Sequence, residues 1–449
     1  MVVERVSGCP CGDLDSFIYE DRVSYTTLSI KFLSLLFSFE MVFALFLRSG
    51  RFKSAQFFHN FPFDLTLFLL LLGVLISVVI FYRRRLNFSP IGLLYLAIFL
   101  VFILYACLSL EWTPGTVYAR EKILKLIIIC LFCIVSGSFV IAYDVKRIRR
   151  FLICLVFVDL WIAGNVAIAS LHHVPGTFLN ALAPENAKGT YLGLSAVLCC
   201  LFLISVLYVF FSECSQLMRM ITLLLLPCLL YLILDVGGRG PLFCMIITFM
   251  VLTIFRMVPF FLTGVVVFKK QLILGLLAIL LVAGFFCFSP SFLARVEKST
   301  TVQRIAVFFQ ENHGGESANQ RMIYYKTALN MFATKPVYGW GIGSFPLVNE
   351  GIDKSGYPHN IILEVFAELG IIGALIFIIF LFLPLVRCNY FLNKDIRFEL
   401  LVIMALFIYY FTWSLITGNI TSIRELYVMS SILFVAEFKT NYLELRFYG

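Results

Sequence analysis

Four short segments of the sequence carry the side chains best suited to chemistry. The first is Pro358-His359-Asn360, which is followed at once by a long apolar run. A neutral histidine can take a proton near pH 7. If the run is a helix, His359 stands at the positive end of its dipole, which lowers the pKa of the imidazole and favours the neutral base. The segment therefore offers a candidate general base. The alternative is a histidine that caps the helix or lies at a membrane interface.

The second segment is Gly237-Gly238-Arg239-Gly240-Pro241, between two apolar runs. Glycines let the backbone turn tightly and let a ligand approach closely. A guanidinium at the membrane edge is costly unless it meets an anion, so Arg239 is a candidate anion-binding residue. The alternative is an arginine that snorkels to lipid headgroups.

The third segment is an amphipathic helix predicted over Ser317–Leu329, ending before Lys335-Pro336. Tyr324 and Tyr325 lie three and four residues after Arg321, so both tyrosines share a helix face with the arginine. A loop arginine is often only solvated, and the spacing alone does not assign Arg321 a role.

The fourth segment alternates glycines with aromatic residues from Pro336 to Phe345. This pattern predicts a tight, adaptable turn, in which Tyr338, Trp340 and Phe345 could stack on a sugar or lie at the interface. The segment lacks the Lys-Ser/Thr ending of a phosphate loop and does not follow a strand, which argues against nucleotide binding.

Two acidic residues, Glu364 and Glu368, follow His359 on one face of the predicted helix. A helical wheel places them about 140° and 180° away from His359. We therefore expect them to pair with basic groups on a neighbouring helix and not to orient the histidine. The outer loops contain no HExxH motif, no DxD pair and no carboxylate cluster for Mg²⁺, so phosphate chemistry here would use arginines and lysines.

A membrane scaffold must position these segments. The chain has 449 residues, of which 61% are hydrophobic and 14% charged, whereas soluble domains are about half apolar and a quarter charged. Hydropathy predicts an all-α polytopic membrane protein with about 12 spans. The spans are expected at Thr26–Leu47, Asp64–Tyr82, Ile91–Leu110, Ile123–Ala142, Phe151–Leu171, Thr190–Phe211, Met218–Leu234, Pro241–Phe255, Leu272–Phe288, His359–Val386, Phe398–Ile416 and Ile423–Val435. The patch Val258–Phe268 is too short to cross comfortably, and is either an interfacial segment or a continuation of the preceding helix.

Basic residues predict the orientation, and the net charge of +9 reflects topology and not a nucleic-acid partner. An N-terminus inside the cell places most basic clusters in cytoplasmic loops. The first outward loop, with Arg48, Arg51 and Lys53, breaks this pattern. The expected organisation is a cytoplasmic tail (1–25), membrane helices (26–288), one large periplasmic loop containing short helices (289–358), further membrane helices (359–438) and a cytoplasmic tail (439–449).

The ordered run from Arg321 to Gly373 resembles the O-antigen ligase family of the bacterial envelope, whose domain is shared with O-antigen polymerases. The resemblance rests on the loop-helix arginine, the glycine-aromatic turn, Pro358-His359-Asn360 and the two glutamates after it. Gly238-Arg239-Gly240 and Gly176-Thr177-Phe178 with Asn186 support it upstream. It covers roughly the last half of the chain, and the first half matches in pattern only.

The resemblance implies a C-type glycosyltransferase fold and a metal-independent, inverting transferase without a cofactor. The donor would be a glycan on undecaprenyl pyrophosphate, and the acceptor a sugar hydroxyl of the lipid A core or a growing glycan. The site would face the periplasm from the bacterial inner membrane, in contact with membrane lipids.

The resemblance also implies roles for individual residues. His359 would be the general base, and Arg239 and Arg321 would hold the pyrophosphate. A lysine on an early span would contact the donor, and Lys122 and Lys125 are equal candidates, with Arg120 able to share the task. Further candidate substrate-binding residues are Asn186, Tyr325, Trp340 and Asn360.

Three other functions remain open. An O-antigen or capsule polymerase would use the same donor, and a protein O-glycosylating ligase is a further relative. A transporter or flippase is the alternative from a different class, but such proteins tend to have repeated halves and charges at mid-membrane. The sequence has no visible repeat, and its candidate residues gather at one predicted face.

Overall fold

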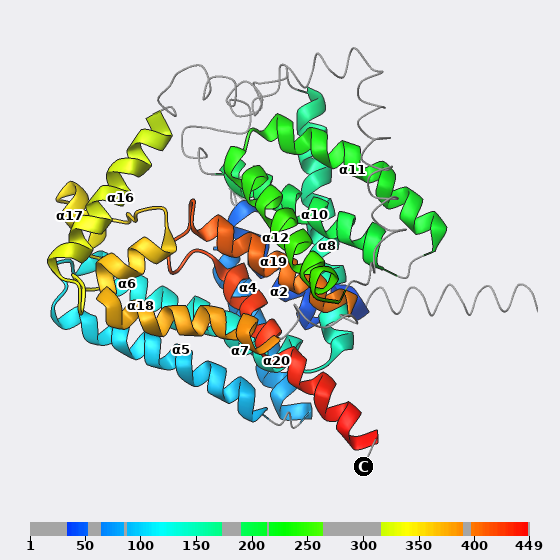
Figure 1. Ribbon diagram of the computed structural model, residues 1–449, viewed down its shortest axis with the longest axis horizontal. Coiled ribbons are helices and arrows are strands. Elements are labelled where there is room, and N and C mark those ends of the chain that lie inside the picture. Colours follow the sequence, from blue (N-terminus) through cyan, green and yellow to red (C-terminus); the bar gives the residue numbers. More distant parts are fainter. Residues whose placement is uncertain are drawn as a thin grey trace, which may run out of the picture.

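The structure is a computed structural model that describes residues 34–52, 64–84, 88–172, 190–212, 215–263, 316–388 and 397–447. Every regular element in these ranges is a helix (Figure 1). The α-helices are α2 (Phe39–Phe52), α4 (Leu65–Arg84), α5 (Pro90–Leu108), α6 (Val117–Lys125), α7 (Leu131–Val135), α8 (Val145–His172), α10 (Thr190–Phe211), α11 (Gln216–Val236), α12 (Arg239–Thr263), α16 (Glu316–Thr334), α17 (Phe345–Glu350), α18 (Ile361–Cys388), α19 (Phe398–Ser414) and α20 (Arg424–Phe447). The short helices η1 (Ser109–Glu111), η2 (Leu126–Cys130) and η3 (Ser136–Ile141) join neighbouring α-helices.

The protein is an all-α polytopic membrane protein, as the composition predicts. Among the described residues, 7 helical segments are long and apolar enough to cross a membrane: Leu65–Arg83, Pro90–Glu111, Val117–Ile141, Val145–Ser170, Tyr191–Phe211, Gln216–Val236 and Ile361–Arg387. Shorter apolar helices cover Arg239–Ile254 and Phe398–Ser414. A described helix overlaps each predicted span except Leu272–Phe288, which lies outside the described residues.

Local signals explain where several of these helices begin and end. The hydroxyl of Ser89 accepts a hydrogen bond from the Gly92 amide at 3.0 Å, and Pro90 occupies the first helical position of α5. Helix α11 ends at Gly237, whose φ of 87° is in the left-handed region that favours glycine. The predicted patch Val258–Phe268 is a continuation of the preceding helix as far as it is described, because α12 runs on to Thr263.

Helices α19 and α20 form the centre of the bundle, with α5, α10, α12 and α18 packed around them (Figure 1). Leu400–Tyr410 and Leu426–Ala436 are buried along their whole length. Gly137 lets η3 approach α20 closely, since a Cβ there would lie 3.2 Å from the carbonyl oxygen of Val428. Such small-residue contacts are typical of helix packing inside membranes.

The prediction that Arg48 lies in an outward loop is wrong. Arg48 belongs to α2 and is fully buried, with its Nε 2.7 Å from Asp159 Oδ1 and an Nη1 3.0 Å from Glu425 Oε1. Two carboxylates compensate the guanidinium inside the bundle, so Arg48 does not act as a loop charge. The side chains of Arg51 and Lys53 lie outside the description.

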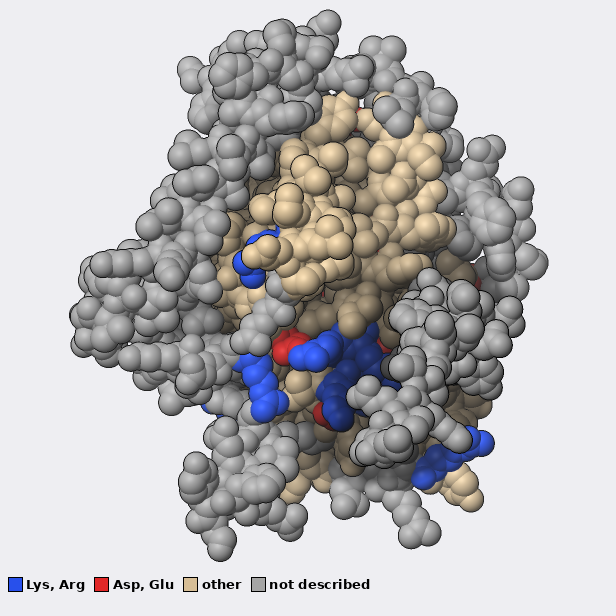
Figure 2. Space-filling model, turned by 90° about the vertical axis from the view of Figure 1, so that its right-hand side faces the viewer, with Lys and Arg blue, Asp and Glu red and all other residues tan. Residues whose placement is uncertain are grey.

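Lysine and arginine side chains gather on the face opposite α16 and α17 (Figure 2). The first turns of α8 carry Lys146, Arg147, Arg149 and Arg150. Arg147 pairs there with Glu40, at 2.8 Å between Nε and Oε1.

Candidate active site

His359 lies directly before α18, outside the candidate membrane span. The helix begins at Ile361, and the Asn360 side chain caps it by accepting hydrogen bonds from the amides of Ile362 and Leu363, both at 3.0 Å. The span expected to start at His359 therefore starts two residues later. The capping alternative for His359 is wrong, because Asn360 performs that task.

The backbone of His359 has a φ of 60°, and no other non-glycine residue in the described ranges has a positive φ. Side chains with a Cβ rarely adopt this conformation, which recurs where a site requires a particular side-chain direction. The turn directs the imidazole between two tyrosines. The ring centroid of Tyr357 lies 4.6 Å away, and that of Tyr324 lies 5.9 Å away with the rings nearly parallel.

These surroundings keep the imidazole neutral. Burial lowers the pKa of His359 to about 4, and the positive charge of Arg321 adds to the effect. The direction agrees with the sequence prediction, whereas the leading cause is burial and not the helix dipole. Nδ1 is buried and has no hydrogen-bond partner among the described residues.

The loop helix that carries Arg321 is confirmed as α16, which ends at Thr334 before Lys335-Pro336 as predicted. Its inner face packs Ala328 and Met331 against Phe345 and Ala367. Figure 1 places α16 beside the start of α18. The helix thus brings Arg321 and Tyr324 to the histidine from a separate part of the chain.

The glycine-aromatic turn packs closely between α18 and the start of α6. Gly339, Gly341 and Gly343 all have positive φ, of 71°, 93° and 73°. A Cβ at Gly339 would lie 2.4 Å from the carbonyl oxygen of Glu368, and one at Gly343 would lie 2.7 Å from the Cα of Ala119. Side chains are excluded at these positions because two other backbones pass so close.

Helix α18 is broken where the turn enters it. Gly370 has a φ of 63° and a ψ of −164°, outside the helical region. The Gly341 amide donates to the Glu368 carbonyl at 2.7 Å, and the Ile371 amide donates to the Pro336 carbonyl at 2.8 Å. The turn thus satisfies backbone groups that the broken helix leaves open.

Trp340 lies in this turn and is half-buried. Its indole N–H donates to the Met331 carbonyl at 2.9 Å and to the Thr334 hydroxyl at 2.9 Å. The Lys335 ammonium lies over the ring, 4.2 Å from its centroid. The side chain therefore joins the end of α16 to the turn, with a cation–π contact to Lys335.

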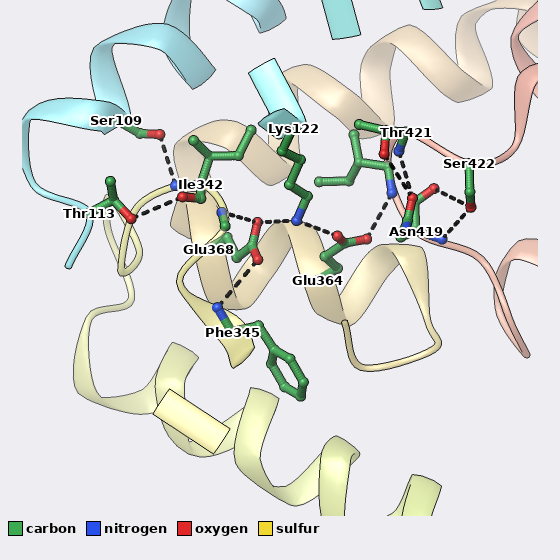
Figure 3. Close-up of polar contacts among 12 residues, drawn as sticks. Ser109, Thr113, Lys122, Ile342, Phe345, Glu364, Glu368, Asn419, Thr421 and Ser422 are labelled. Atoms are coloured by element: carbon green, nitrogen blue, oxygen red, sulfur yellow. Dashed lines mark hydrogen bonds and ion pairs between the residues drawn. The ribbon is translucent and has the colours of Figure 1, made fainter. Parts of the chain in front are cut away.

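The glutamates after His359 meet a lysine from α6, as predicted. Lys122 Nζ lies 2.5 Å from Glu364 Oε1 and 2.6 Å from Glu368 Oε2, and all three side chains are fully buried (Figure 3). Glu364 also accepts from the Ile420 amide at 2.8 Å. Glu368 accepts from the amides of Gly343 and Phe345 at 2.9 and 3.4 Å.

The other candidates on α6 have different surroundings. Lys125 is partly exposed and pairs with Glu121 one helical turn away, at 2.5 Å. Arg120 is exposed, and no described carboxylate pairs with its guanidinium. Of the three cationic side chains expected near the donor, Lys122 is therefore the one enclosed by protein.

Arg239 is the first residue of α12, at the end of the tight turn predicted from its glycines. A Cβ at Gly240 would lie 3.2 Å from the Trp413 ring and 3.6 Å from Ile416. The Tyr325 hydroxyl reaches the Leu415 carbonyl at 3.5 Å. The start of α12, next to Arg239, thus lies against the segment 415–420 that follows α19, and α16 and α18 each contact the same segment.

Sequence reasoning missed Asp353, which anchors the loop before His359. Its carboxylate accepts hydrogen bonds from the amides of Thr116, Val117 and Tyr118, at 2.8, 2.8 and 3.1 Å. These bonds, led by the one from Val117, lower the pKa of Asp353. The aspartate therefore caps α6 from another segment, and no local pattern could reveal this.

The candidate substrate-binding residue Asn186 lies outside the described residues.

Comparison with known proteins shows what the part of the chain around this site is similar to. The family model described as O-antigen ligase matches residues 220–378, which include Arg239, Arg321 and His359. A protein of Rickettsia conorii, named provisionally as a polysaccharide ligase, is 27% identical over 168 residues. The match covers 35% of this chain and 38% of that protein.

Residues 220–378 of this chain are therefore similar to the O-antigen ligase family, and their described part lies in the membrane bundle. The resemblance read from the sequence is confirmed for residues 220–378. Lys122 lies outside this range, although both of its carboxylate partners lie inside it.

Proposed function

We propose that this protein is an O-antigen ligase that transfers a glycan from undecaprenyl pyrophosphate to a sugar hydroxyl of the lipid A core. The observation that carries the proposal is the setting of His359. It combines a neutral, half-buried imidazole, a neighbouring arginine on the loop helix and a position at the end of a membrane span. The family match over these residues supports the same conclusion.

His359 acts as the general base in this proposal. The acceptor oxygen attacks the anomeric carbon of the donor while the imidazole removes the hydroxyl proton. The bond from that carbon to the pyrophosphate oxygen breaks, and its electron pair leaves with the pyrophosphate. One displacement of this kind inverts the anomeric centre and requires no covalent intermediate on the protein.

Arg239 and Arg321 stabilise the departing pyrophosphate. A guanidinium can donate two parallel hydrogen bonds to phosphate oxygens, which strengthens its contact as negative charge develops. The two arginines come from different helices that converge on the segment 415–420. Arg321 also favours the neutral form of His359, so one residue serves both the leaving group and the base.

Further side chains around the site contact the substrate in this proposal. Arg120, which is exposed on α6, is the better placed of the early cations to meet the donor, and Lys125 could join it by leaving Glu121. Asn360 and Tyr325 border the site from the α18 cap and from α16, and Asn186 completes the proposed substrate contacts. Trp340 contributes its partly exposed ring to sugar binding.

We place the site at the periplasmic face of the bacterial inner membrane, in a C-type glycosyltransferase fold of about 12 spans. Basic residues on the opposite face support this orientation (Figure 2). A site at the membrane surface suits a donor whose lipid tail stays in the bilayer. The reaction as proposed uses no metal ion and no cofactor.

A transfer assay with defined substrates tests the function. The full-length protein in lipid vesicles receives a lipid-pyrophosphate glycan and a lipid A core acceptor, with EDTA present. Ligation should give the core carrying the whole donor glycan, with inverted anomeric configuration. Growth of lipid-linked glycan without core modification would instead establish a polymerase, and modification of a protein acceptor alone would establish a protein ligase. No transfer to any acceptor would overturn the proposal.

A further inference from the structure

We infer that Lys122, Glu364 and Glu368 form a positioning cluster, in which Lys122 acts through the two carboxylates and does not bind the donor. The inference rests on the proposed glycan transfer and deepens it, because it gives the early-span lysine a different task from the one that the resemblance implies. Figure 3 shows Lys122 reaching between the two carboxylates, with a hydrogen-bonded backbone segment beyond each of them.

Burial and pairing leave this lysine little capacity for a ligand. Its side chain is fully buried, and its ammonium already contacts two carboxylates at 2.5 and 2.6 Å. A phosphate arriving there would meet two negative side chains together with one positive one. The geometry fits an internal counter-ion better than a pyrophosphate ligand.

Each carboxylate connects the cluster to one side of the candidate active site. Glu368 accepts the Phe345 amide, and the Phe345 ring packs edge-on against Tyr324, which stacks on His359. Glu364 accepts the Ile420 amide in the segment that also contacts α12 and α16. Lys122 therefore positions both carboxylates and, through them, the turn that contains Phe345 and the segment that contains Ile420.

This arrangement makes a prediction that a donor-binding lysine does not share. Removing one member of a buried ion cluster leaves an uncompensated charge, whereas replacing all members by neutral groups is often tolerated. Glutamine at position 364 can still accept the hydrogen bond from the Ile420 amide, and the single amide oxygen of glutamine at position 368 can accept the shorter of the two bonds there, from the Gly343 amide. The triple variant Lys122→Met, Glu364→Gln, Glu368→Gln should thus keep the bonds to Gly343 and Ile420 without the lysine.

The experiment measures kcat and the KM for the donor in full-length variants. Lys122→Met should lower kcat by on the order of tenfold or more, with the KM for the donor nearly unchanged. The triple variant should regain most of the lost kcat. If the triple variant is as inactive as Lys122→Met, or if the KM for the donor rises in both, Lys122 contacts the donor and the inference is wrong.

A second readout does not depend on transfer. Backbone amide exchange should rise around Gly343, Phe345 and Ile420 in Lys122→Met, and at Gly343 and Ile420 it should return toward the wild-type rate in the triple variant. Unchanged exchange in Lys122→Met contradicts the cluster. Absence of transfer by the wild type, with the expected exchange pattern, would overturn the proposed function and leave the positioning cluster intact.

Arg147→Met is the matched control, because it breaks a buried ion pair with Glu40 near the start of α8. It should lower thermal stability while kcat per folded molecule stays near the wild-type value. A fall in kcat equal to that of Lys122→Met would mean that loss of any buried pair impairs transfer, and it would overturn the specific role given to Lys122.

Discussion

The imidazole of His359 stacks on the ring of Tyr324, with centroids 5.9 Å apart and planes inclined by 18°. His359 precedes the membrane span of α18, and Tyr324 belongs to the loop helix α16. The contact explains why neither the turn before α18 nor helix α16 forms the site by itself. The loop helix supplies the surface that buries the imidazole, and the turn before α18 supplies the unusual backbone that directs it.

The Arg321→Gln substitution should raise the pKa of His359. Burial and the Arg321 charge both lower this pKa to about 4, so removal of the charge moves it upward, toward its ordinary value of 6.5. The base is active when neutral, and the acid limb of the kcat/KM profile should therefore shift to higher pH. Rates measured at low donor concentration from acidic to neutral pH test this. An acid limb that stays in place would show that Arg321 does not act on the base.

Arg239→Lys separates charge from geometry. Lysine keeps the positive charge but loses the planar fork that binds two phosphate oxygens. We expect kcat to fall on the order of 10²-fold, comparable to the loss of one donor to a developing anion. The kcat of Arg239→Gln should fall at least as far as that of Arg239→Lys. Near-wild-type kcat in the lysine variant would assign Arg239 to lipid headgroups and not to the leaving group.

Asp353→Ala should destabilise the protein at the start of α6 by about 1 kcal/mol, the usual cost of removing a helix cap. The substitution removes the acceptor for three amides at the start of α6. Thermal unfolding measures the effect. Lys354→Ala is the neighbouring control, since its exposed pair with Glu350 should contribute little. Equal melting temperatures for Asp353→Ala and the wild type would argue against the anchor.

Gly370→Ala should disrupt the break in α18. A Cβ there would lie 2.4 Å from the Val337 carbonyl oxygen, and the φ of 63° is itself unfavourable for alanine. We expect a loss of at least about 1–3 kcal/mol, read from thermal unfolding. Gly164→Ala in α8 is the control, because its Cβ would have no neighbour within 4 Å. Similar stability of the two variants would contradict the close packing of the glycine-aromatic turn against the break in α18.

Hydropathy and periodicity predict most of the fold. The apolar runs locate the helices, and the end of α16 before Lys335-Pro336 follows from the proline. The helical wheel also predicts that Glu364 and Glu368 turn away from His359. These features are set by residues close in sequence, which is why local patterns reveal them.

Long-range contacts account for what the sequence does not predict. From its place in the sequence Arg48 resembles a loop charge, but in the structure it pairs with Asp159 and Glu425 on other helices. The glycine-aromatic pattern predicts a tight, adaptable turn, but it does not reveal that the glycines make room for the backbones of α6 and α18. Asp353 and Lys122 acquire their roles from partners more than two hundred positions away. No spacing rule connects residues at such separations.

The most direct test of the central claim is single-turnover transfer by His359→Gln in the purified full-length protein. Glutamine keeps a polar side chain but cannot take the proton. The variant should bind the lipid-pyrophosphate donor as tightly as the wild type, insert and fold normally, and lose on the order of 10²–10⁴-fold in transfer rate. Transfer at the wild-type rate by a folded His359→Gln protein would contradict the assignment of His359 as the base.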